Sequence, residues 1–446
     1  MQLPIAYCQL TIIKQYEKMK KLCMMGLLLL TTSFLFAQVK IDDLINVKEV
    51  EHIEKTLSSD DMRGRRTFTP DIDNAANFIA GEFKKIGLQT FNGGKTYKQE
   101  FAMVRPKFIS ASATFDGNAL DQKNIVIVTC QPDLHIDESS GYLFANIRKG
   151  ENLFLAVSAI MRTNKNVIIL VDESLASNFS RLTNLNRSIF KTDKNFVFVL
   201  SNVVPKKFII EAKHEIPEQS LANVVGVLPG KSKRDEYVIF SGHYDHLGVG
   251  RPENGDSIYN GANDDAAGTT AVIMLAKYFK ALGNNERTIV FAAFTAEEIG
   301  GYGSQYFSRQ FDPGKVAAMF NIEMIGTESK WGKNSAYITG YEKTDMGQIL
   351  QRNLEGTGFT FYPDPYTGQN LFYRSDNATL ARLGVPAHTI STSKMDSEPN
   401  YHKVSDQIET LDLDNMTMII RSIALSSKTI VAGRDTPARV KMEELK

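Results

Sequence analysis

Two adjacent glutamates, Glu297 and Glu298, follow an apolar run in the segment FAAFTAEEIGGYGS at residues 291–304. Neighbouring carboxylates repel each other, so this pair needs a physical explanation. Either the two residues form the solvated start of a helix, where acidic side chains interact favourably with the helix dipole, or they perform two tasks at one site. Consecutive residues at a strand end point in different directions, which would allow two separate tasks.

Other side chains that can bind metals lie after the expected strands or at the start of the expected helix. They are His243, Asp245, Asn263, Asp264, Asp265, Glu323 and His402. In α/β proteins, ligands bind outside the carboxyl ends of the sheet strands. We therefore expect these side chains to meet the glutamate pair at one edge of a sheet.

A group of this composition calls for a cation. Three or more carboxylates raise each other's pKa and cannot all ionise. Two histidines with three carboxylates are nitrogen and oxygen ligands that suit zinc, and suit manganese or cobalt less well. Five ligands exceed the three protein groups of a usual catalytic zinc site. The pattern therefore predicts two zinc ions that share one carboxylate.

The elements that must position these residues are strands alternating with helices. From residue 221 onward, a long apolar helix is expected at 266–283, and strands are expected at 236–242, 287–295, 316–326, 336–339 and 385–391. Continuous apolar strands that alternate with helices predict an α/β fold with a mostly parallel sheet and helices on both faces. We assign residues 221–446 to this catalytic domain.

The preceding residues divide into three parts. Residues 38–105 carry two amphipathic helical patterns and form the N-terminal part of the catalytic domain. Residues 106–220 are rich in apolar strand runs and are predicted to be an inserted lobe. Residues 1–37 comprise an upstream extension and, at 19–37, a basic, apolar and small-residue pattern typical of a secretory signal. The sequence thus predicts a secreted or periplasmic protein, with a retained anchor as the alternative.

The composition and the missing motifs exclude several other classes of function and site. The chain has 446 residues with 51 basic and 51 acidic side chains, so no charge excess indicates binding to nucleic acid or to an anionic membrane. Cys8 and Cys23 lie in or before the signal, which leaves Cys130 alone and excludes an internal disulfide and a cysteine-based zinc site in the mature chain. The sequence has neither an HExxH nor a GxSxG motif.

Five motifs in order resemble the co-catalytic two-zinc aminopeptidases, a zinc exopeptidase family that also contains glutamate carboxypeptidases and glutaminyl cyclases. The motifs are SGHYDHLG, NGANDDAAG, FTAEEIGGYGS, NIEMIG and YHKVSD. The resemblance covers about the last 225 residues. It implies the three-layer zinc-exopeptidase (phosphorylase/hydrolase-like) fold, and the inserted lobe resembles the protease-associated domain of some members.

The resemblance also implies roles for individual residues. His243 and Glu323 would bind one zinc, Glu298 and His402 the other, and Asp264 both. Three further residues would assist: Glu297 as general base, Asp245 as the carboxylate that orients a ligand, and Tyr401 as a donor to the oxyanion. A cis peptide bond is expected after the shared aspartate, at Asp264–Asp265.

Some positions depart from the family pattern or lie outside it. Position 323 is Glu where many members have Asp, position 265 is Asp where Asn is common, and position 377 is Asn where His is frequent. We interpret the segment RSDNATLARLG, residues 374–384, as substrate-pocket wall, so Asn377 would bear on specificity more than on zinc. His246 and His388 lack an orienting partner in the sequence and are expected to be structural.

The expected function is hydrolysis of N-terminal residues from peptides, with peptide as the partner and no stable membrane association after signal removal. Two alternatives remain on the same fold. A carboxypeptidase would need a cation for the terminal carboxylate, for which Arg374 is a candidate, and a glutaminyl cyclase-like enzyme would use one zinc. A third alternative is an inactive binding module that has lost its ligands.

Overall fold

The structure is a computed structural model that describes residue 18 and residues 40–445. The expected signal at 19–37 lies outside the described residues, as do Cys8 and Cys23. Cys130 is a free, partly buried thiol. Among the described residues, no helix combines the length and the apolar composition that a membrane crossing requires.

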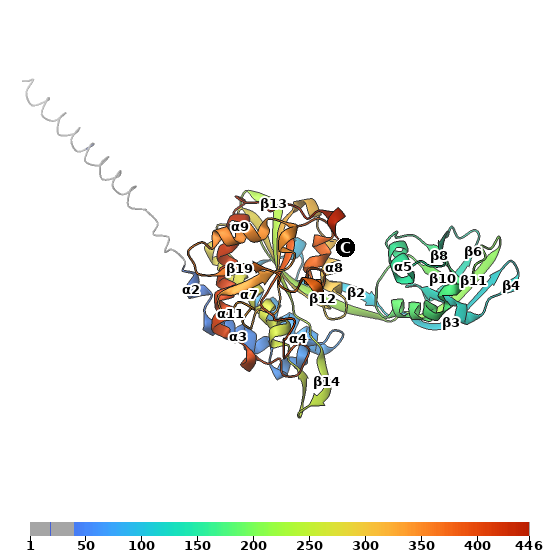
Figure 1. The fold of residues 1–446 in the computed structure, drawn as a ribbon, viewed down its shortest axis with the longest axis horizontal. Helices are drawn as coiled ribbons and strands as arrows, with labels where there is room; N and C mark the ends of the chain where they lie inside the picture. The colour runs from blue at the N-terminus through green and yellow to red at the C-terminus, as the bar shows by residue number, and fades with distance from the viewer. Residues whose placement is uncertain (1–17, 19–39, 446) are drawn as a thin grey trace, which may run out of the picture. The chain divides into compact units, whose positions relative to one another are not determined.

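A ten-stranded sheet forms the centre of the catalytic region (Figure 1). Its strands are β1 (Gln89–Thr90), β2 (Lys98–Val104), β9 (Ile189–Phe190), β12 (Glu218–Leu228), β13 (Lys233–His243), β16 (Arg287–Phe294), β17 (Val316–Ile322), β18 (Ser335–Ile338), β19 (Thr360–Pro363) and β20 (Ala387–Ser391). They lie in the order β19, β18, β20, β17, β13, β16, β12, β2 and β9, and β1 pairs with β12.

The α/β fold is confirmed, but the sheet is mixed. The central strands β16, β13, β17 and β20 run parallel, whereas β12 joins β16 and β18 joins β20 in antiparallel orientation. Parallel neighbours need a crossover connection, which the helix between β13 and β16 provides. Apolar runs indicate buried strands but not their direction, so the prediction of a mostly parallel sheet holds only for the centre.

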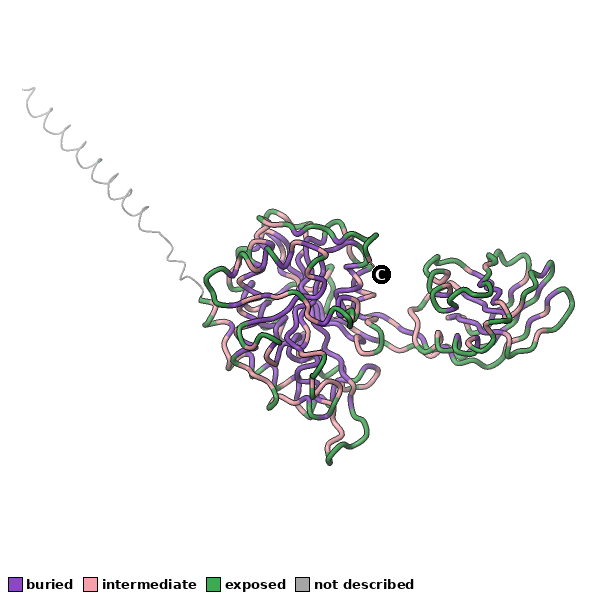
Figure 2. Tube along the Cα trace, in the orientation of Figure 1, coloured by how far each residue is buried: buried purple, intermediate pink, exposed green. Residues whose placement is uncertain are grey.

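Helices cover both faces of this sheet. One face carries α3 (Val47–Leu57), α4 (Pro70–Ile86), α7 (Ala267–Leu282) and α11 (Leu413–Ser426), with α9 (Met346–Asn353) beside α11, and the other carries α8 (Tyr302–Ser308) and α10 (Asn377–Ala381). Adjacent residues of β13 show the division, because their side chains point to opposite faces. Phe240 stacks on Phe279 of α7 at 5.4 Å between ring centres, whereas Ile239 packs in one cluster with Phe307 of α8. Figure 2 shows buried residues, in purple, gathered at the centre of this region.

The strands between residues 107 and 215, apart from β9, form two further four-stranded sheets. One consists of β5 (Ile125–Val128), β10 (Phe196–Leu200), β8 (Val167–Val171) and β7 (Leu143–Ile147), and the other of β4 (Asn118–Ala119), β3 (Lys107–Phe115), β11 (Phe208–Glu215) and β6 (Asp133–Asp137). Apolar side chains from both sheets share one core, and α5 (Leu153–Met161) adds to a second. The division of the chain into domains stays a prediction.

Candidate active site

The ends of the central strands bring most of the predicted metal ligands together. His243 is the last residue of β13, and Glu323 directly follows β17. Glu298 comes shortly after β16, and Asp264 lies in the helical turn Ala262–Ala266 that precedes α7. His402 reaches the same place from a loop after β20.

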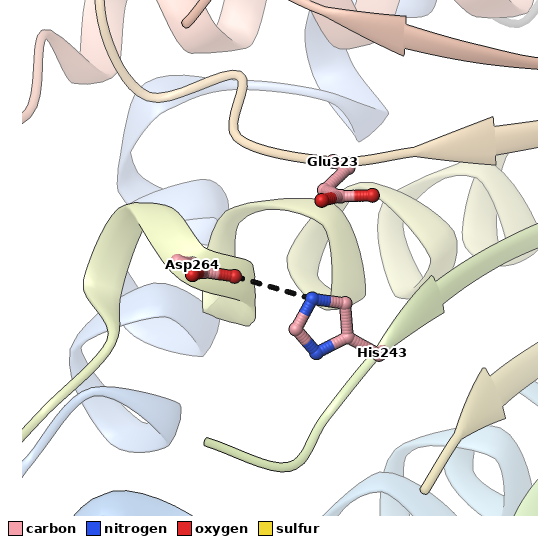
Figure 3. A group of neighbouring side chains, drawn as sticks. All are labelled: His243, Asp264 and Glu323. Carbon is pink, nitrogen blue, oxygen red and sulfur yellow. Dashed lines mark ion pairs between the residues drawn. The ribbon is translucent and has the colours of Figure 1, made fainter. Parts of the chain in front are cut away.

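Three of these side chains form the first group. The Nε2 atom of His243 lies 3.2 Å from Oδ1 of Asp264. One donor atom from each of His243, Asp264 and Glu323 falls within 4.8 Å of the other two. Figure 3 shows both carboxylates near the imidazole, each carried by a different segment of the chain. This arrangement could hold one metal ion.

A second group lies on the other side of Asp264. The Nε2 atom of His402 is 3.2 Å from Oδ2 of Asp264 and 3.1 Å from Oε2 of Glu298. The Nδ1 atom of His246 is 2.8 Å from Oε1 of Glu298 and 4.0 Å from Oδ2 of Asp264. Asp264 therefore contacts histidines of both groups, as a shared ligand must.

His246 was expected to be structural, yet it lies inside this second group. We call the six side chains of both groups the donor cluster: His243, His246, Asp264, Glu298, Glu323 and His402. The other histidine expected to be structural, His388, lies elsewhere, and both of its ring nitrogens have partners at 2.8 Å, Thr344 Oγ1 and the Thr339 carbonyl oxygen.

Two buried aspartates hold the backbone of the segments that carry the cluster. Asp265 accepts hydrogen bonds from the backbone N–H groups of His243 (3.1 Å) and Met324 (3.1 Å). Asp406 accepts from those of Asn263 (2.8 Å) and Asp264 (3.0 Å). From the sequence, Asp265 was expected only among the side chains that can bind metals, and Asp406 was not identified, although it lies in the same YHKVSD motif as His402. The expected cis peptide bond at Asp264–Asp265 is confirmed.

Asp245 orients its neighbours in two ways. The Nδ1–H of His243 donates to the backbone carbonyl of Asp245 at 3.1 Å, whereas the Asp245 carboxylate is 3.8 Å from that nitrogen. The carboxylate instead accepts hydrogen bonds from the backbone N–H groups of Glu297 (3.1 Å) and Glu298 (3.4 Å). The sequence predicted that this carboxylate orients the histidine, but the carbonyl makes the hydrogen bond.

Arg65 forms hydrogen bonds with two loops that carry residues of the cluster, the turn after β13 and the turn before Asp264. Its guanidinium is fully buried and donates to the carbonyls of Tyr244 (2.8 Å) and Gly261 (2.9 Å), as well as Asn260 and Leu57. The Tyr244 carbonyl follows His243 directly. These bonds hold the turn after β13 against the turn before Asp264.

Glu297 does not point to the same place as its neighbour Glu298. It lines a cavity of about 300 Å³ together with residues in and just before α8, such as Gly301 and Ser304, and residues in and around α10, such as Arg374. A substrate could therefore lie against Glu297 while Glu298 contacts the histidines. The pair has two directions, as the sequence predicted for adjacent residues at a strand end.

Asn377 is not part of this cavity wall. Its carboxamide donates to the carbonyl oxygens of Phe372 (3.0 Å) and Ala387 (3.3 Å) and accepts from the hydroxyl of Thr389 (2.8 Å). The flanking residues Asp376 and Ala378 line the cavity instead. The segment 374–384 thus lines the cavity through other residues, whereas the first turn of α10 directs the Asn377 side chain into the core.

Tyr401 lies beside the second group. Its ring stacks on that of His402, with ring centres 3.9 Å apart. Burial raises the pKa of its phenol, as do the nearby carboxylates of Asp264 and Glu298. The hydroxyl therefore stays protonated and can donate a hydrogen bond.

The electrostatics of the site favour a bound cation. Burial raises the pKa of Glu323 to about 7 and that of Asp245 to about 7, and it raises the pKa of Glu297 well above its usual value. Burial also opposes ionisation of Asp264, but its contacts with His243 and His402 hold its pKa below the usual value. A bound divalent cation would restore the ionised form of the nearby carboxyls.

Missing hydrogen bonds within the donor cluster also indicate a site for a metal ion. Several buried atoms have no hydrogen-bond partner: His243 Nε2, both ring nitrogens of His246, Glu298 Oε1 and Glu323 Oε2. Buried polar atoms are nearly always paired in folded proteins. These nitrogens and oxygens face one another, so a metal ion between them would be their common partner, and the donor set fits zinc.

Residues 223–426 match the model of Peptidase family M28. Among curated proteins, the chain is 30% identical over 203 residues to a probable leucine aminopeptidase of Trichophyton verrucosum, covering 44% of this chain and 53% of that protein. It is 29% identical over 212 residues to leucine aminopeptidase 1 of Leptosphaeria maculans, covering 44% and 52%. The chain thus spans about half the length of the curated relatives it matches.

Solved structures share the fold over nearly the whole chain. An aminopeptidase from Aneurinibacillus sp. strain AM-1 superposes with a TM-score of 0.52 at 15% identity, covering 91% of this chain and 98% of that one. A zinc aminopeptidase from Bacillus subtilis gives 0.51 at 16% identity, covering 90% and 99%. At this identity, the likeness concerns the fold.

Proposed function

From the match of residues 223–426 to the model of peptidase family M28 and from the geometry of the site, we propose that this chain is a zinc-dependent aminopeptidase of that family. The observation that carries the proposal is the donor cluster, whose buried, unpartnered nitrogens and oxygens face one another next to Glu297 and its cavity. The names of the curated relatives and of the Bacillus subtilis fold neighbour support the activity and the metal.

We assign two zinc ions to each chain. His243 and Glu323 would hold one ion, Glu298 and His402 the other, and Asp264 both. Zinc, when bound, polarises a carbonyl oxygen and lowers the pKa of water. Secretion, which depends on residues 19–37, stays a prediction.

Two residues act on the substrate in this proposal. Glu297 accepts a proton from the water that attacks the scissile carbonyl carbon. As the C–N bond breaks, Glu297 donates that proton to the leaving amine. The Tyr401 hydroxyl donates a hydrogen bond to the carbonyl oxygen while negative charge develops on it.

The test is turnover on a panel of single-residue aminoacyl anilides, with chelator and with added zinc. We expect hydrolysis of substrates with a free amino group, loss of hydrolysis with chelator, and recovery with zinc. Equal hydrolysis of amino-acetylated substrates would contradict an aminopeptidase.

One observation keeps a carboxypeptidase as a second candidate. Arg374 lines the same cavity as Glu297 and could bind a terminal carboxylate. Peptides blocked at the carboxyl end separate the two functions, because an aminopeptidase cleaves them and a carboxypeptidase does not.

A further inference from the structure

The inference concerns His246, whose ring is buried at the second group of the donor cluster. Its Nδ1 atom lies 2.8 Å from Oε1 of Glu298, yet neither ring nitrogen makes a hydrogen bond. The atoms are close enough for such a bond but not aligned for it. Both atoms are therefore available to a third partner.

A purely structural histidine in the same protein looks different. His388 is equally buried, but both of its ring nitrogens are paired, with Thr344 and Thr339. A buried imidazole in a folded core normally has such partners. His246 lacks them, so its surroundings are incomplete without a ligand.

The spacing around His246 suits a metal ion. Two atoms that bind one tetrahedral zinc at its usual bond lengths lie about 3.3 Å apart. The nitrogens of His246 and His402 are 2.8 and 3.1 Å from the carboxylate oxygens of Glu298, and the His402 nitrogen is 3.2 Å from Asp264. The two imidazole rings are inclined at 69° with centres 5.8 Å apart, and they contact different oxygens of Glu298.

The backbone holds His246 in this position. Its N–H donates to the carbonyl of Arg65 at 3.3 Å. Its ring lies against Gly261, where a Cβ atom would come within 2.5 Å of the ring Cγ. Arg65 in turn donates to the Gly261 carbonyl. This buried arginine therefore contacts the backbone of both His246 and Gly261.

We propose that His246 is a further ligand of the metal position formed by Asp264, Glu298 and His402. This position would then have four protein donors, whereas the position formed by His243, Asp264 and Glu323 has three. The inference rests on the metal content assigned under the proposed function. It goes beyond it, because the two positions become chemically unequal.

The inequality has a consequence for the reaction. Zinc sites with four protein ligands are closed, whereas catalytic sites keep one position open. The three-donor position therefore has room for substrate and water, and the four-donor position retains its ion more tightly. Zinc should fill the four-donor position first.

The first test counts imidazole ligands directly. In the cobalt(II)-substituted protein, each bound histidine contributes a strongly shifted, exchangeable ring N–H signal to the proton NMR spectrum. We expect three such signals, from His243, His246 and His402, and the loss of one in His246→Asn. Two signals in the wild-type protein, unchanged in the variant, would overturn the proposal.

A second variant, His246→Cys, should produce a new absorption band if position 246 binds the metal. His246→Cys places a thiolate at this site, and the longer zinc–sulfur bond, about 2.3 Å instead of 2.0 Å, compensates for the shorter side chain. With cobalt, a thiolate ligand produces a charge-transfer band in the near ultraviolet. Its absence from a folded variant that binds two cobalt ions would overturn the proposal.

Zinc titration by calorimetry completes the design. Loss of a residue that only orients a ligand already weakens metal affinity about 10–100-fold, so His246→Asn should weaken one of two sites by at least about tenfold. His388→Asn is the matched control and should leave both affinities unchanged. A wild-type protein that binds no zinc would contradict the proposed function itself, whereas two unaltered sites in His246→Asn would contradict only this inference.

Discussion

Two neighbouring groups of buried, charged side chains differ in where their polar atoms find partners. The Arg65 guanidinium is fully buried, and backbone carbonyls of four residues accept its N–H groups. The donor cluster, held in part by that arginine, is also largely buried, but several of its nitrogens and oxygens have no partner within the protein.

The difference shows which buried charges serve the fold and which serve a ligand. A buried charge is costly unless it is paired or hydrogen-bonded. Arg65 meets this condition with protein atoms alone, so its task is to hold loops in place. The donor cluster meets it only with an external cation. The following predictions test this contrast, from the largest expected effect to the smallest.

Metal removal should affect the donor cluster and leave the surroundings of Arg65 intact. We expect chelation to abolish turnover and to lower the melting temperature, because an ion present at 100 times its Kd contributes about 2.7 kcal/mol to stability. Calorimetry with and without chelator, followed by return of zinc, measures both effects. Full activity in protein shown to be metal-free by mass spectrometry would refute the contrast.

Glu297→Gln should lower the catalytic rate without changing metal binding by the donor cluster. General acid–base catalysis typically contributes about 10²–10⁴-fold, so kcat should fall by a factor in this range. Zinc content and melting temperature should stay as in the wild type. Glu355→Gln, an exposed site, is the control. Near-normal turnover in Glu297→Gln would show that the proton acceptor is another group.

Arg65→Lys should damage the fold and the cluster together. Lysine keeps the charge but cannot reach all four carbonyls, and unpaired buried polar groups are costly. We expect the free energy of unfolding to fall by at least about 3 kcal/mol and zinc to bind more weakly. Arg63→Lys is the matched control, because Arg63 is exposed and forms a surface ion pair with Asp71.

Denaturant unfolding and zinc titration of these two arginine variants give the decisive comparison. If Arg65→Lys loses stability while its folded form binds zinc as tightly as the wild type, Arg65 serves the fold alone.

Glu54 offers the mildest test, through pH. Burial raises its pKa to about 8, and the Thr270 hydroxyl donates to its carboxyl at 2.8 Å. Because the folded pKa lies above the unfolded value of 4.5, the folded state retains a proton that the unfolded state loses. The stability of the wild type should therefore decline as pH rises from about 4.5 to about 8.

Glu54→Gln should remove this contribution, because glutamine resembles the protonated acid and can accept the same hydrogen bond. Relative to the variant, wild-type stability should fall by up to about 1.4 kcal/mol for each pH unit in this window. Unfolding in urea at several pH values measures the difference. A constant difference between the two proteins from pH 5 to pH 8 would show that Glu54 is ionised in the fold.

Much of the donor cluster was predictable because apolar runs locate buried strands. His243 and Glu323 follow such runs directly, and parallel strands deliver their ends to one edge of the sheet. The directions of the flanking strands were not predictable in this way. They depend on how chain connections cross the sheet, which an apolar pattern does not encode.

His246 and Asn377 show where sequence patterns do not predict the direction of a side chain. Both lie beyond a strand end or at a helix start, where the alternation of side chains no longer applies. The direction of His246 depends on contacts of its turn with Arg65 and Gly261, and that of Asn377 on acceptors in other segments.

The sequence by itself determined the kinds of donors, their order along the chain and the strands that carry them. It therefore predicted that a site for divalent metal and a paired glutamate would lie at one sheet edge. Only the tertiary structure decided which donors face one another. Distances between side chains depend on contacts among segments far apart in sequence, such as those that Arg65 makes with Tyr244 and Gly261.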